Sequence, residues 1–327
     1  MTATPEILDA PVTTIEYDVE DSRPLQQLPS TDGRARWEQF ALAVFIVVPL
    51  LCVGAAGFVL WGHGLSWLDV TLSVVFYSLT LHGITVGFHR YFTHGSFKAK
   101  RPLRIGLAIA GSMAIEGPVT RWVADHRRHH AYSDAEGDPH SPWRYGNDFR
   151  SLCKGLYHAH VGWLFDVEQT DQQRFAPDLL ADHDIARVAK AFPLLVTFSL
   201  LAPAVLGGVL TWSWTGALTA FFWASVLRIG VLHHITWSIN SICHTWGSRP
   251  FATRDRAVNV WWLAAISGGE SWHNLHHADP TCARHGVDKG QLDSSASVIA
   301  LFEGLGWASD VRWPKAERLA ARRATAA

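Results

Sequence analysis

The sequence predicts an all-α integral membrane protein in which four transmembrane helices, arranged as two hairpins, carry a cytosolic helical cap holding a two-metal site. Three observations support this prediction. Apolar residues form long runs, basic residues are concentrated between the second and third runs, and histidines cluster in three places. Hydrophobic residues make up 48% of the 327 and charged residues only 17%, which favours a membrane protein over a large soluble core.

Four apolar runs are long enough to cross a bilayer. They cover residues 40–61, 67–88, 191–210 and 216–237. At a rise of about 1.5 Å per residue, each run spans a hydrocarbon core of about 30 Å as a helix. The short links 62–66 and 211–215 leave room only for a tight connection, so each pair of runs is expected to form a hairpin.

Basic residues predict the sidedness of the chain. Both short links lack Lys and Arg, whereas residues 89–190 contain many. The positive-inside rule therefore places this segment and both termini in the cytoplasm, together with the histidine clusters. We expect a unit of residues 39–310, whose cytosolic cap comprises 89–190 and 238–310. Residues 1–38 are expected to form a polar, disordered tail, and residues 311–327 a C-terminal tail.

Shorter apolar stretches predict further helices that do not span the bilayer. Interfacial or cap helices are expected over residues 103–115, 258–266 and 298–307. Ionisable groups within the fourth span usually face a cavity, so we expect a pocket lined by Arg228, His233 and His234.

Cysteine usage and net charge exclude other classes of protein. The four cysteines contain no CxxC pair, which favours reduced thiols over disulfides or metal ligands. A net charge of −1 provides no basic field for nucleic acid.

Histidine spacing indicates a metal site. Two triplets are spaced i, i+3, i+4, so on a helix the members of each triplet share a face. Imidazole is the commonest metal ligand, and nine are too many for one ion but suit two. The nine candidates are His89, His94, His126, His129, His130, His244, His273, His276 and His277. His89 and His94 are five residues apart and are not expected to share an α-helical face fully, whereas Asn240 and His244 do.

The remaining histidines carry weaker expectations. His63 is assigned to a loop and His82 to helix packing, while His183 and His285 are expected on the solvated surface. Five others are expected either to orient the metal ligands or to be polar groups of the cap. These are His140, His158, His160, His233 and His234.

From about Gly87 to Trp307 the chain resembles the membrane fatty acyl desaturases, in particular the acyl-CoA Δ9 (stearoyl-CoA) group. The resemblance rests on the order and spacing of HRxxxH, HRxHH and HNxHH, which begin at His89, His126 and His273. Four intervening motifs also match: Asp138-Pro139-His140, His160-Val-Gly-Trp163, Asn240-Ser-x-x-His244 and Gly269-Glu270-x-x-His273-Asn274.

The resemblance implies an O₂-dependent enzyme that inserts a cis double bond, at Δ9, into a saturated long-chain acyl thioester such as acyl-CoA. It implies two iron ions held by the nine histidines, with Asn240 reaching one iron through water. It also implies a bent acyl tunnel with Trp122, Thr236 and Trp237 near the bend. Electrons are expected from a separate donor, such as a ferredoxin or a flavoprotein reductase using NAD(P)H. Arg127 and Arg128 are candidates for docking an acidic donor.

Several positions depart from the acyl-CoA pattern and leave alternatives open. Where that group carries basic or amide side chains against CoA, this chain has Ala124, Glu116-Gly117 and the stretch 164–168. CoA could instead meet Arg121 or Lys154, or the carrier could be acyl carrier protein or a membrane lipid. A hydroxylase or ketolase on the same scaffold and a membrane metal transporter or sensor are the competing functions.

Overall fold

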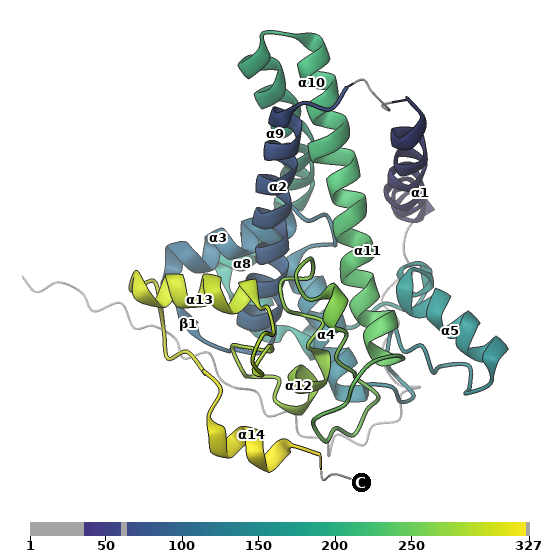
Figure 1. Cartoon of the computed structure of the whole chain (residues 1–327), viewed down its shortest axis with the longest axis vertical. Helices are drawn as coiled ribbons and strands as arrows, with labels where there is room; N and C mark the ends of the chain where they lie inside the picture. Colours follow the sequence, from purple (N-terminus) through teal and green to yellow (C-terminus); the bar gives the residue numbers. More distant parts are fainter. Residues whose placement is uncertain (1–35, 60–63, 325–327) are drawn as a thin grey trace, which may run out of the picture.

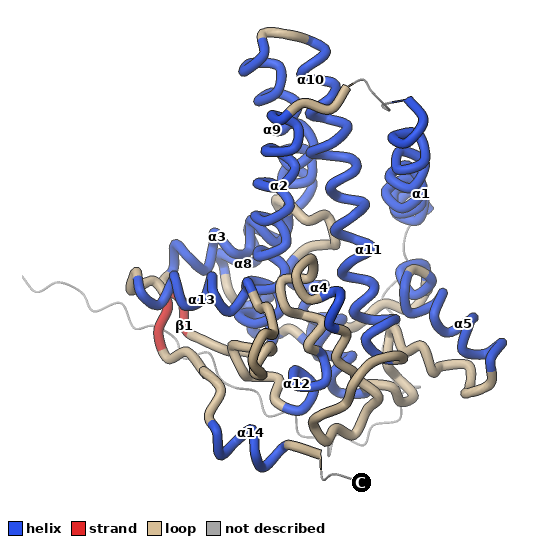
Figure 2. Tube along the Cα trace, in the orientation of Figure 1, coloured by secondary structure: helices blue, strands red, loops and turns tan. Residues whose placement is uncertain are grey.

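Four long helices form one end of the molecule, and shorter helices and loops form a cap at the other end (Figure 1). We describe a computed structural model that covers residues 36–59 and 64–324. The expectations for residues 1–35 of the polar tail and for His63 lie outside these ranges. Helix is the dominant structure, as Figure 2 shows, so the predicted all-α class is confirmed.

Within residues 36–59 and 64–324, four helices are long and apolar enough to cross a membrane, which confirms the predicted number of spans. The first is α1 (Arg36–Val59), and the second is α2 (Trp67–His82) with its π-helical continuation η2 (Gly83–Thr93). The third is α9 (Phe192–Thr211). The fourth runs through α10 (Trp214–Ala220), η4 (Phe221–Leu227), α11 (Arg228–Ser241) and η5 (Ile242–His244).

Local sequence explains where these helices begin and turn. Ser66 caps α2, because its hydroxyl accepts from the backbone N–H of Asp69 while the Asp69 carboxylate accepts from the N–H of Ser66. The buried Asp69 also accepts from the Thr219 hydroxyl, which ties the second span to the fourth. The α9–α10 hairpin packs closely: a Cβ on Gly207 would lie 2.4 Å from the Cβ of Ala220.

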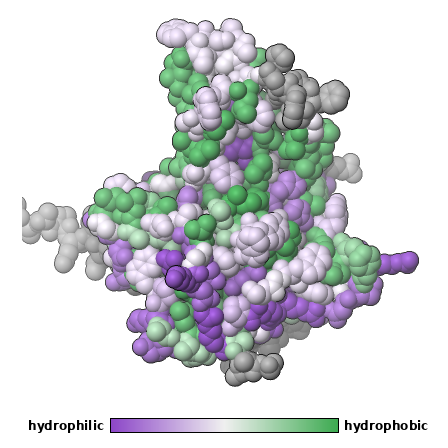
Figure 3. Space-filling view, viewed as in Figure 1, coloured by the Kyte–Doolittle hydropathy of each residue, from purple (hydrophilic) through white to green (hydrophobic). Residues whose placement is uncertain are grey.

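The surface of the four-helix end is apolar. Hydrophobic side chains gather over the long helices and polar side chains over the cap (Figure 3). On α1, Phe40 is 72% exposed and Leu51 66% exposed, which is costly in water but suits contact with lipid tails.

The second and fourth spans run further than predicted, to Thr93 and His244 rather than to residues 88 and 237. The sequence prediction ended each span where polar residues begin. These polar residues continue the helices because their histidines are buried in the cap instead of facing lipid or water.

The cap contains short helices around the ends of these two spans. They are α3 (Arg101–Ser112), α4 (Val119–Tyr132), α5 (Phe149–His160), η3 (Gly162–Phe165), α6 (Gln172–Phe175), α7 (Pro177–Ala181), α8 (His183–Lys190), η6 (Trp261–Leu263), α12 (His273–Ala278), α13 (Ser294–Gly304) and α14 (Ala316–Arg322). A two-stranded antiparallel sheet pairs β1 (Lys98–Ala99) with β2 (Ala308–Ser309).

Two of the three predicted short helices are present, as α3 and α13. The third prediction, over residues 258–266, was wrong. This stretch contains only the short turn η6, because Asn259 pairs with Ser248 and Trp272 in isolated β-bridges. Its apolar residues Val258, Val260 and Leu263 pack into a small core cluster without helical periodicity.

The close approach of α3 to η2 gives a stability prediction. A Cβ on Gly111 would lie 2.4 Å from the Phe88 ring, whereas a Cβ on Gly106 of the same helix meets nothing within 4 Å. Gly111→Ala should therefore destabilise the protein by about 1–3 kcal/mol through overpacking. Gly106→Ala should be neutral or stabilising, because alanine favours helix. Thermal unfolding in detergent measures both, and equal midpoints for the two variants would contradict the packing.

Candidate metal centre

The nine predicted histidines come together in the cap as two groups. Within each group, one ring nitrogen of every histidine lies within 4.8 Å of those of the others. The first group contains His89, His94, His126, His130 and His276. The second contains His129, His244, His273 and His277. Each group can hold one metal ion, with five and four imidazoles respectively.

The two triplets lie on helices as their spacing predicted. Helix α4 carries His126, His129 and His130, and α12 carries His273, His276 and His277. Each triplet supplies ligands to both groups. The two candidate ions would therefore share the same two supporting helices.

His89 and His94 do share a face, contrary to the expectation from α-helical geometry. They lie at the end of η2, where the backbone is π-helical and the N–H of His94 donates to the carbonyl of His89. In a π-helix, residues five apart stack as residues four apart do in an α-helix. The ring centroids of the two histidines are therefore only 4.9 Å apart.

The ring nitrogens converge at distances that suit metal ligation. The Nε2 atoms of His276 and His89 are 3.0 Å apart, and those of His276 and His130 are 2.9 Å apart. In the second group, the Nε2 atom of His273 lies 3.1 Å from that of His244 and 3.0 Å from that of His277. Two nitrogens bound to one ion at about 2.1 Å lie roughly 3 Å apart at a right angle.

Buried carboxylates orient four of the imidazoles. Three of these carboxylates accept a hydrogen bond from Nδ1–H, and the fourth, Glu270, lies in ion-pair contact with the Nδ1 atom of His89, which directs each Nε2 lone pair toward the interior of the group. The pairs are Glu270 with His89, Asp138 with His129 at 3.0 Å, Asp134 with His244 at 2.8 Å and Asp255 with His277 at 2.7 Å. This arrangement is typical of metal-binding histidines, so the donor set fits a metal.

Four histidines of the first group that lie outside the spans are also held in the protonation state that a metal requires. Burial lowers the pKa of His94 to about 3, and it lowers the pKa of His126, His130 and His276 well below the ordinary value. A ligating imidazole must be neutral. The buried Nε2 atoms of His94 and His129 have no hydrogen-bond partner among the described residues, a cost that a bound cation removes.

His285 was predicted on the solvated surface, and this prediction was wrong. It is only 1% exposed, and its ring centroid lies 4.7 Å from that of His276. The guanidinium of the fully buried Arg90 lies 3.3 Å from its Nδ1 and also pairs with Glu270 and Asp293. An isolated histidine in a polar loop gives no periodic signal, so only the folded loop reveals its place behind the ligands.

The other histidines divide between the site and the packing. His140 stacks on His129 at a centroid distance of 4.3 Å, beside Asp138. His158 instead bonds the carbonyl of Pro139, and His160 bonds Ser241 and His234. His82 bonds Ser78 and Ser294, and His183 is exposed.

The predicted intramembrane pocket is only partly present. His233 lines a cavity, but Arg228 does not, because Ser199 and the Ala224 carbonyl accept its hydrogen bonds. His234 bonds His160 instead. All four cysteines are free thiols, as predicted, although Cys153 is exposed rather than buried.

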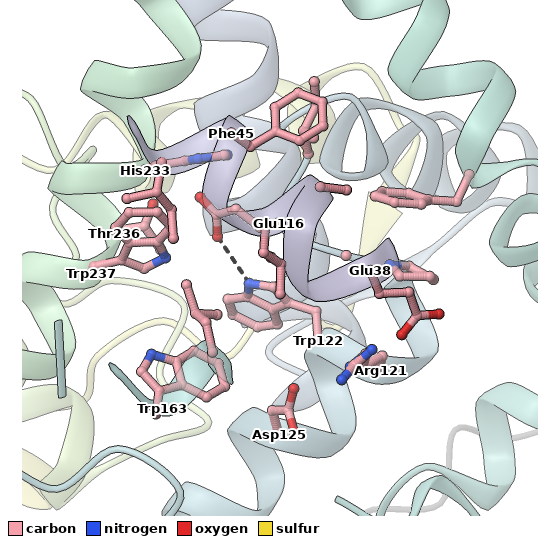
Figure 4. A pocket seen from close by; sticks show the side chains of 18 of the residues that line it. Glu38, Phe45, Glu116, Arg121, Trp122, Asp125, Trp163, His233, Thr236 and Trp237 are labelled. Atoms are coloured by element: carbon pink, nitrogen blue, oxygen red, sulfur yellow. Dashed lines mark hydrogen bonds between the residues drawn. The ribbon is translucent and has the colours of Figure 1, made fainter. Parts of the chain in front are cut away.

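An apolar cavity of about 430 Å³ leads to the histidine groups. Its walls come from α1, α4, α9 and α11, and it reaches His126 and Asn240. All three predicted substrate-contact residues, Trp122, Thr236 and Trp237, line it (Figure 4). Trp122 stacks on His126 at a centroid distance of 5.0 Å, so the cavity wall continues directly into the first histidine group.

A buried acid, Glu116, was not singled out as a site residue from the sequence. Its carboxyl accepts a hydrogen bond from the Trp122 indole at 3.1 Å inside the cavity, drawn as the dashed line in Figure 4. Burial raises the pKa of Glu116 to about 7, although hydrogen bonds from Thr236 and Trp122 oppose the shift. Near neutral pH this carboxyl therefore exists in both protonation states.

Comparison with known proteins agrees with this site. The model of the fatty acid desaturase family matches residues 65–291, which contain both histidine groups. The chain belongs to the fatty acid desaturase family. It is therefore an oxidoreductase of lipid metabolism within the membrane, and the histidine groups that could hold a metal are consistent with that family.

Individual relatives of this desaturase differ in the carrier that their names specify. The chain is 37% identical to the hex-5-enoyl-[acyl-carrier protein] acetylenase of Moorena producens, over 86% of this chain and 88% of the relative. It is 33% identical to the Delta-9 acyl-lipid desaturase 1 of Arabidopsis thaliana, with the same shares covered. It is also 33% identical to the acyl-CoA C20 Delta5-desaturase of Anemone leveillei, over 76% and 75%.

Removing one orienting carboxylate should weaken the metal site. Asp255→Asn removes the charge that holds His277, so metal affinity should fall about tenfold to a hundredfold. Metal content after graded chelator treatment measures the effect. The matched control is Asp148→Asn at the exposed N-terminus of α5, which should retain the metal like the unaltered protein. Equal retention by both variants would contradict the orienting role.

The raised pKa of Glu116 predicts a pH dependence of stability. The folded state binds this proton up to about pH 7, whereas the unfolded chain releases it near 4.5, so the free energy of unfolding falls as pH rises between these values. The full effect is on the order of 3 kcal/mol. Glu116→Gln should abolish this part of the dependence, measured as thermal midpoints between pH 5 and 7.5. Glu136→Gln, at an exposed position, should leave the pH dependence of the thermal midpoint unchanged. The same pH dependence in the unaltered protein and in both variants would contradict the prediction.

Proposed function

We propose that this desaturase is an O₂-dependent enzyme that forms a cis double bond, at Δ9, in a saturated long-chain acyl group, using two iron ions. The observation that carries the proposal is the continuity between the apolar cavity and the first histidine group, through Trp122 and His126. An acyl chain in this cavity would present a CH₂–CH₂ unit to the histidines while water is excluded.

The nine histidines are the proposed iron ligands, five on one ion and four on the other. Bound there, iron and O₂ supply the oxidising power that unactivated CH₂ groups require and that acid–base side chains cannot provide. Asn240 lines the cavity next to the ligands and is the proposed holder of a water between protein and metal. Trp122, Thr236 and Trp237 orient the chain, and orientation decides which carbons react.

For the carrier we propose a membrane lipid in preference to acyl-CoA. The cavity is bounded on one side by apolar residues of α1, including Leu42, Phe45 and Ile46, so the acyl chain can enter from the bilayer. Among the described residues that line the cavity, Arg121 is the one Lys or Arg, and it is accompanied by Glu38 and Asp125 (Figure 4). The phosphates of CoA favour several cations, which the described part of this lining does not offer.

Lys154, the other cation considered for CoA, lies over the Tyr145 ring and does not line the cavity. Acyl-CoA and acyl carrier protein are the second candidate carriers, since relatives named for these carriers are 33% and 37% identical to this chain, respectively. The proposed orientation has both termini and the histidine site in the cytoplasm, where a separate electron donor, a ferredoxin or a flavoprotein reductase using NAD(P)H, would reach it.

A metal transporter fits the geometry less well. Transporters place their ligands near the bilayer midplane on interrupted helices, whereas these histidines lie where two spans enter the cap. A hydroxylase on the same scaffold would differ in product, because it adds oxygen to the acyl chain.

Expression in a desaturase-deficient host tests the reaction. We expect a new cis-9 monoene from saturated C16 or C18 chains, with its position read by mass spectrometry. Oxygenated chains would indicate the hydroxylase instead. For the carrier, protein in lipid nanodiscs should desaturate distearoyl phosphatidylcholine but not stearoyl-CoA, and the reverse would overturn the lipid proposal.

Ligand substitutions test the metal assignment. His276→Ala should reduce desaturation to background and lower the iron content, because the Nε2 atom of this ring lies 3.0 Å from that of His89 and 2.9 Å from that of His130 in the first group. Asn240→Ala should reduce the rate less and leave the iron content nearly unchanged. The exposed His183→Ala is the control. Retained activity in His276→Ala, with the protein inserted in the membrane, would overturn the assignment.

A further inference from the structure

A second hollow reaches the histidine groups through residues that do not line the acyl cavity. This groove, with a volume of about 1460 Å³, is lined by three of the nine candidate ligands. His94 and His130 belong to the first group, and His277 belongs to the second. The acyl cavity instead reaches His126 and Asn240, and the two linings share no residue. The histidine site is therefore reached by two separate cavities.

The groove has fixed walls. One wall is the C-terminal segment 310–318, which is held by backbone hydrogen bonds of Arg312 to Ser96 and of Ala283 to Arg312. The opposite wall includes residues 252–255, where the Arg254 guanidinium donates to the carbonyl of His130. The predicted C-terminal tail thus forms part of the cap. In Figure 1, α14, which contributes Arg318 to the groove, lies at the end of the molecule opposite the hairpin loops.

The groove carries net positive charge. Its lining contains five Lys or Arg side chains and two carboxylates, Asp255 and Asp310, and two of the five cations, Arg127 and Arg318, pair with carboxylates outside the lining. Asp255 is engaged by His277 and Asp310 by Lys98. Three of the cations have no carboxylate partner among the residues the structure describes. These are Arg254, Arg312 and Lys315.

The two arginines first considered for docking are unsuitable. Arg127 is only 5% exposed and is bound by Asp178 and the carbonyls of Phe92 and Phe175. Arg128 is 9% exposed and donates to the carbonyl of Gly137. Both stabilise the cap from within, whereas Arg312 and Lys315 lie at the surface of the groove.

We infer that this groove is the docking surface for an acidic one-electron carrier protein, which delivers electrons to the histidine site by an approach separate from the acyl cavity. The inference rests on the proposed function. Forming one double bond converts CH₂–CH₂ and O₂, with two electrons and two protons, into CH=CH and two waters. Two reduced carriers are therefore oxidised per turnover, and each must reach the site without opening the acyl cavity to water.

Charge complementarity supports a protein of this kind. Opposite surface charge speeds encounter and fixes orientation, and its effect weakens as salt rises. Helix α14, which contributes Arg318 to the groove, lies at the end of the molecule opposite the hairpin loops of the spans (Figure 1), so a soluble acidic protein can reach the groove more readily than a lipid headgroup. It also meets the metal ligands directly, which shortens the path of the electrons.

The test uses the full chain in nanodiscs with an acidic [2Fe–2S] ferredoxin as the probe. The dissociation constant of ferredoxin is measured by titration. The rate of desaturation with ferredoxin as reductant is then divided by the rate with dithionite as reductant, both for the same preparation. Arg312→Glu/Lys315→Glu should weaken binding and lower this ratio, each by about tenfold. Arg150→Glu, an exposed charge reversal on α5 at a separate side of the cap, is the matched control and should change neither.

The ratio of the two rates distinguishes impaired docking from general damage to the protein, because a loss of structure lowers the ferredoxin-driven and the dithionite-driven rate together. The single variant Lys315→Glu provides the same comparison if the double variant does not fold. Unchanged ferredoxin affinity in the folded groove variant, or equal loss in Arg150→Glu, would overturn the docking site while leaving desaturation intact. No unsaturated product with dithionite in the unaltered protein would instead overturn the proposed function itself.

Discussion

The hydrogen bonds between buried carboxylates and histidine Nδ1 atoms are the constraint on which the rest of the cap depends. Nine imidazoles that point their Nε2 lone pairs inward repel one another, and burial lowers the pKa of cap histidines such as His126 and His276, which favours their neutral form. Asp134, Asp138, Asp255 and Glu270 hold four of these rings in place from behind. The carboxylates in turn need partners, and Arg90, together with backbone N–H groups such as that of Arg256, provides them.

This network explains why the cap is polar inside. Arg90 is fully buried, yet Glu270 and Asp293 neutralise it, and Asp293 also accepts from the backbone of His285 and Gly286. A buried ion pair of this kind stabilises only when its hydrogen bonds are complete. The loops after α12 are therefore tied to the metal ligands, although they contribute none themselves.

The sequence was informative where a regular period or a long run carried the signal. The four spans and the shared faces of the triplets on α4 and α12 followed from length and from i, i+3, i+4 spacing. The sequence did not predict local structure that depends on contacts between distant residues. The β-bridges of Asn259 replaced an expected helix, and the loop around His285 folded under the ligands without any local pattern. The charge of the groove also depends on the ion pairs that the fold forms, since Arg127 pairs with Asp178 whereas Arg312 has no carboxylate partner among the residues that the structure describes.

The π-helical turn at the end of the second span explains the spacing of two candidate ligands in the sequence. An α-helix advances about 100° per residue, so five residues overshoot a full turn and would direct His89 and His94 apart. One additional residue per turn brings them back into line. His89 and His94 are therefore spaced more widely than the histidines of the two triplets because they lie at the end of a π-helical segment. Two ligands five residues apart at the end of a span thus indicate a π-helical turn.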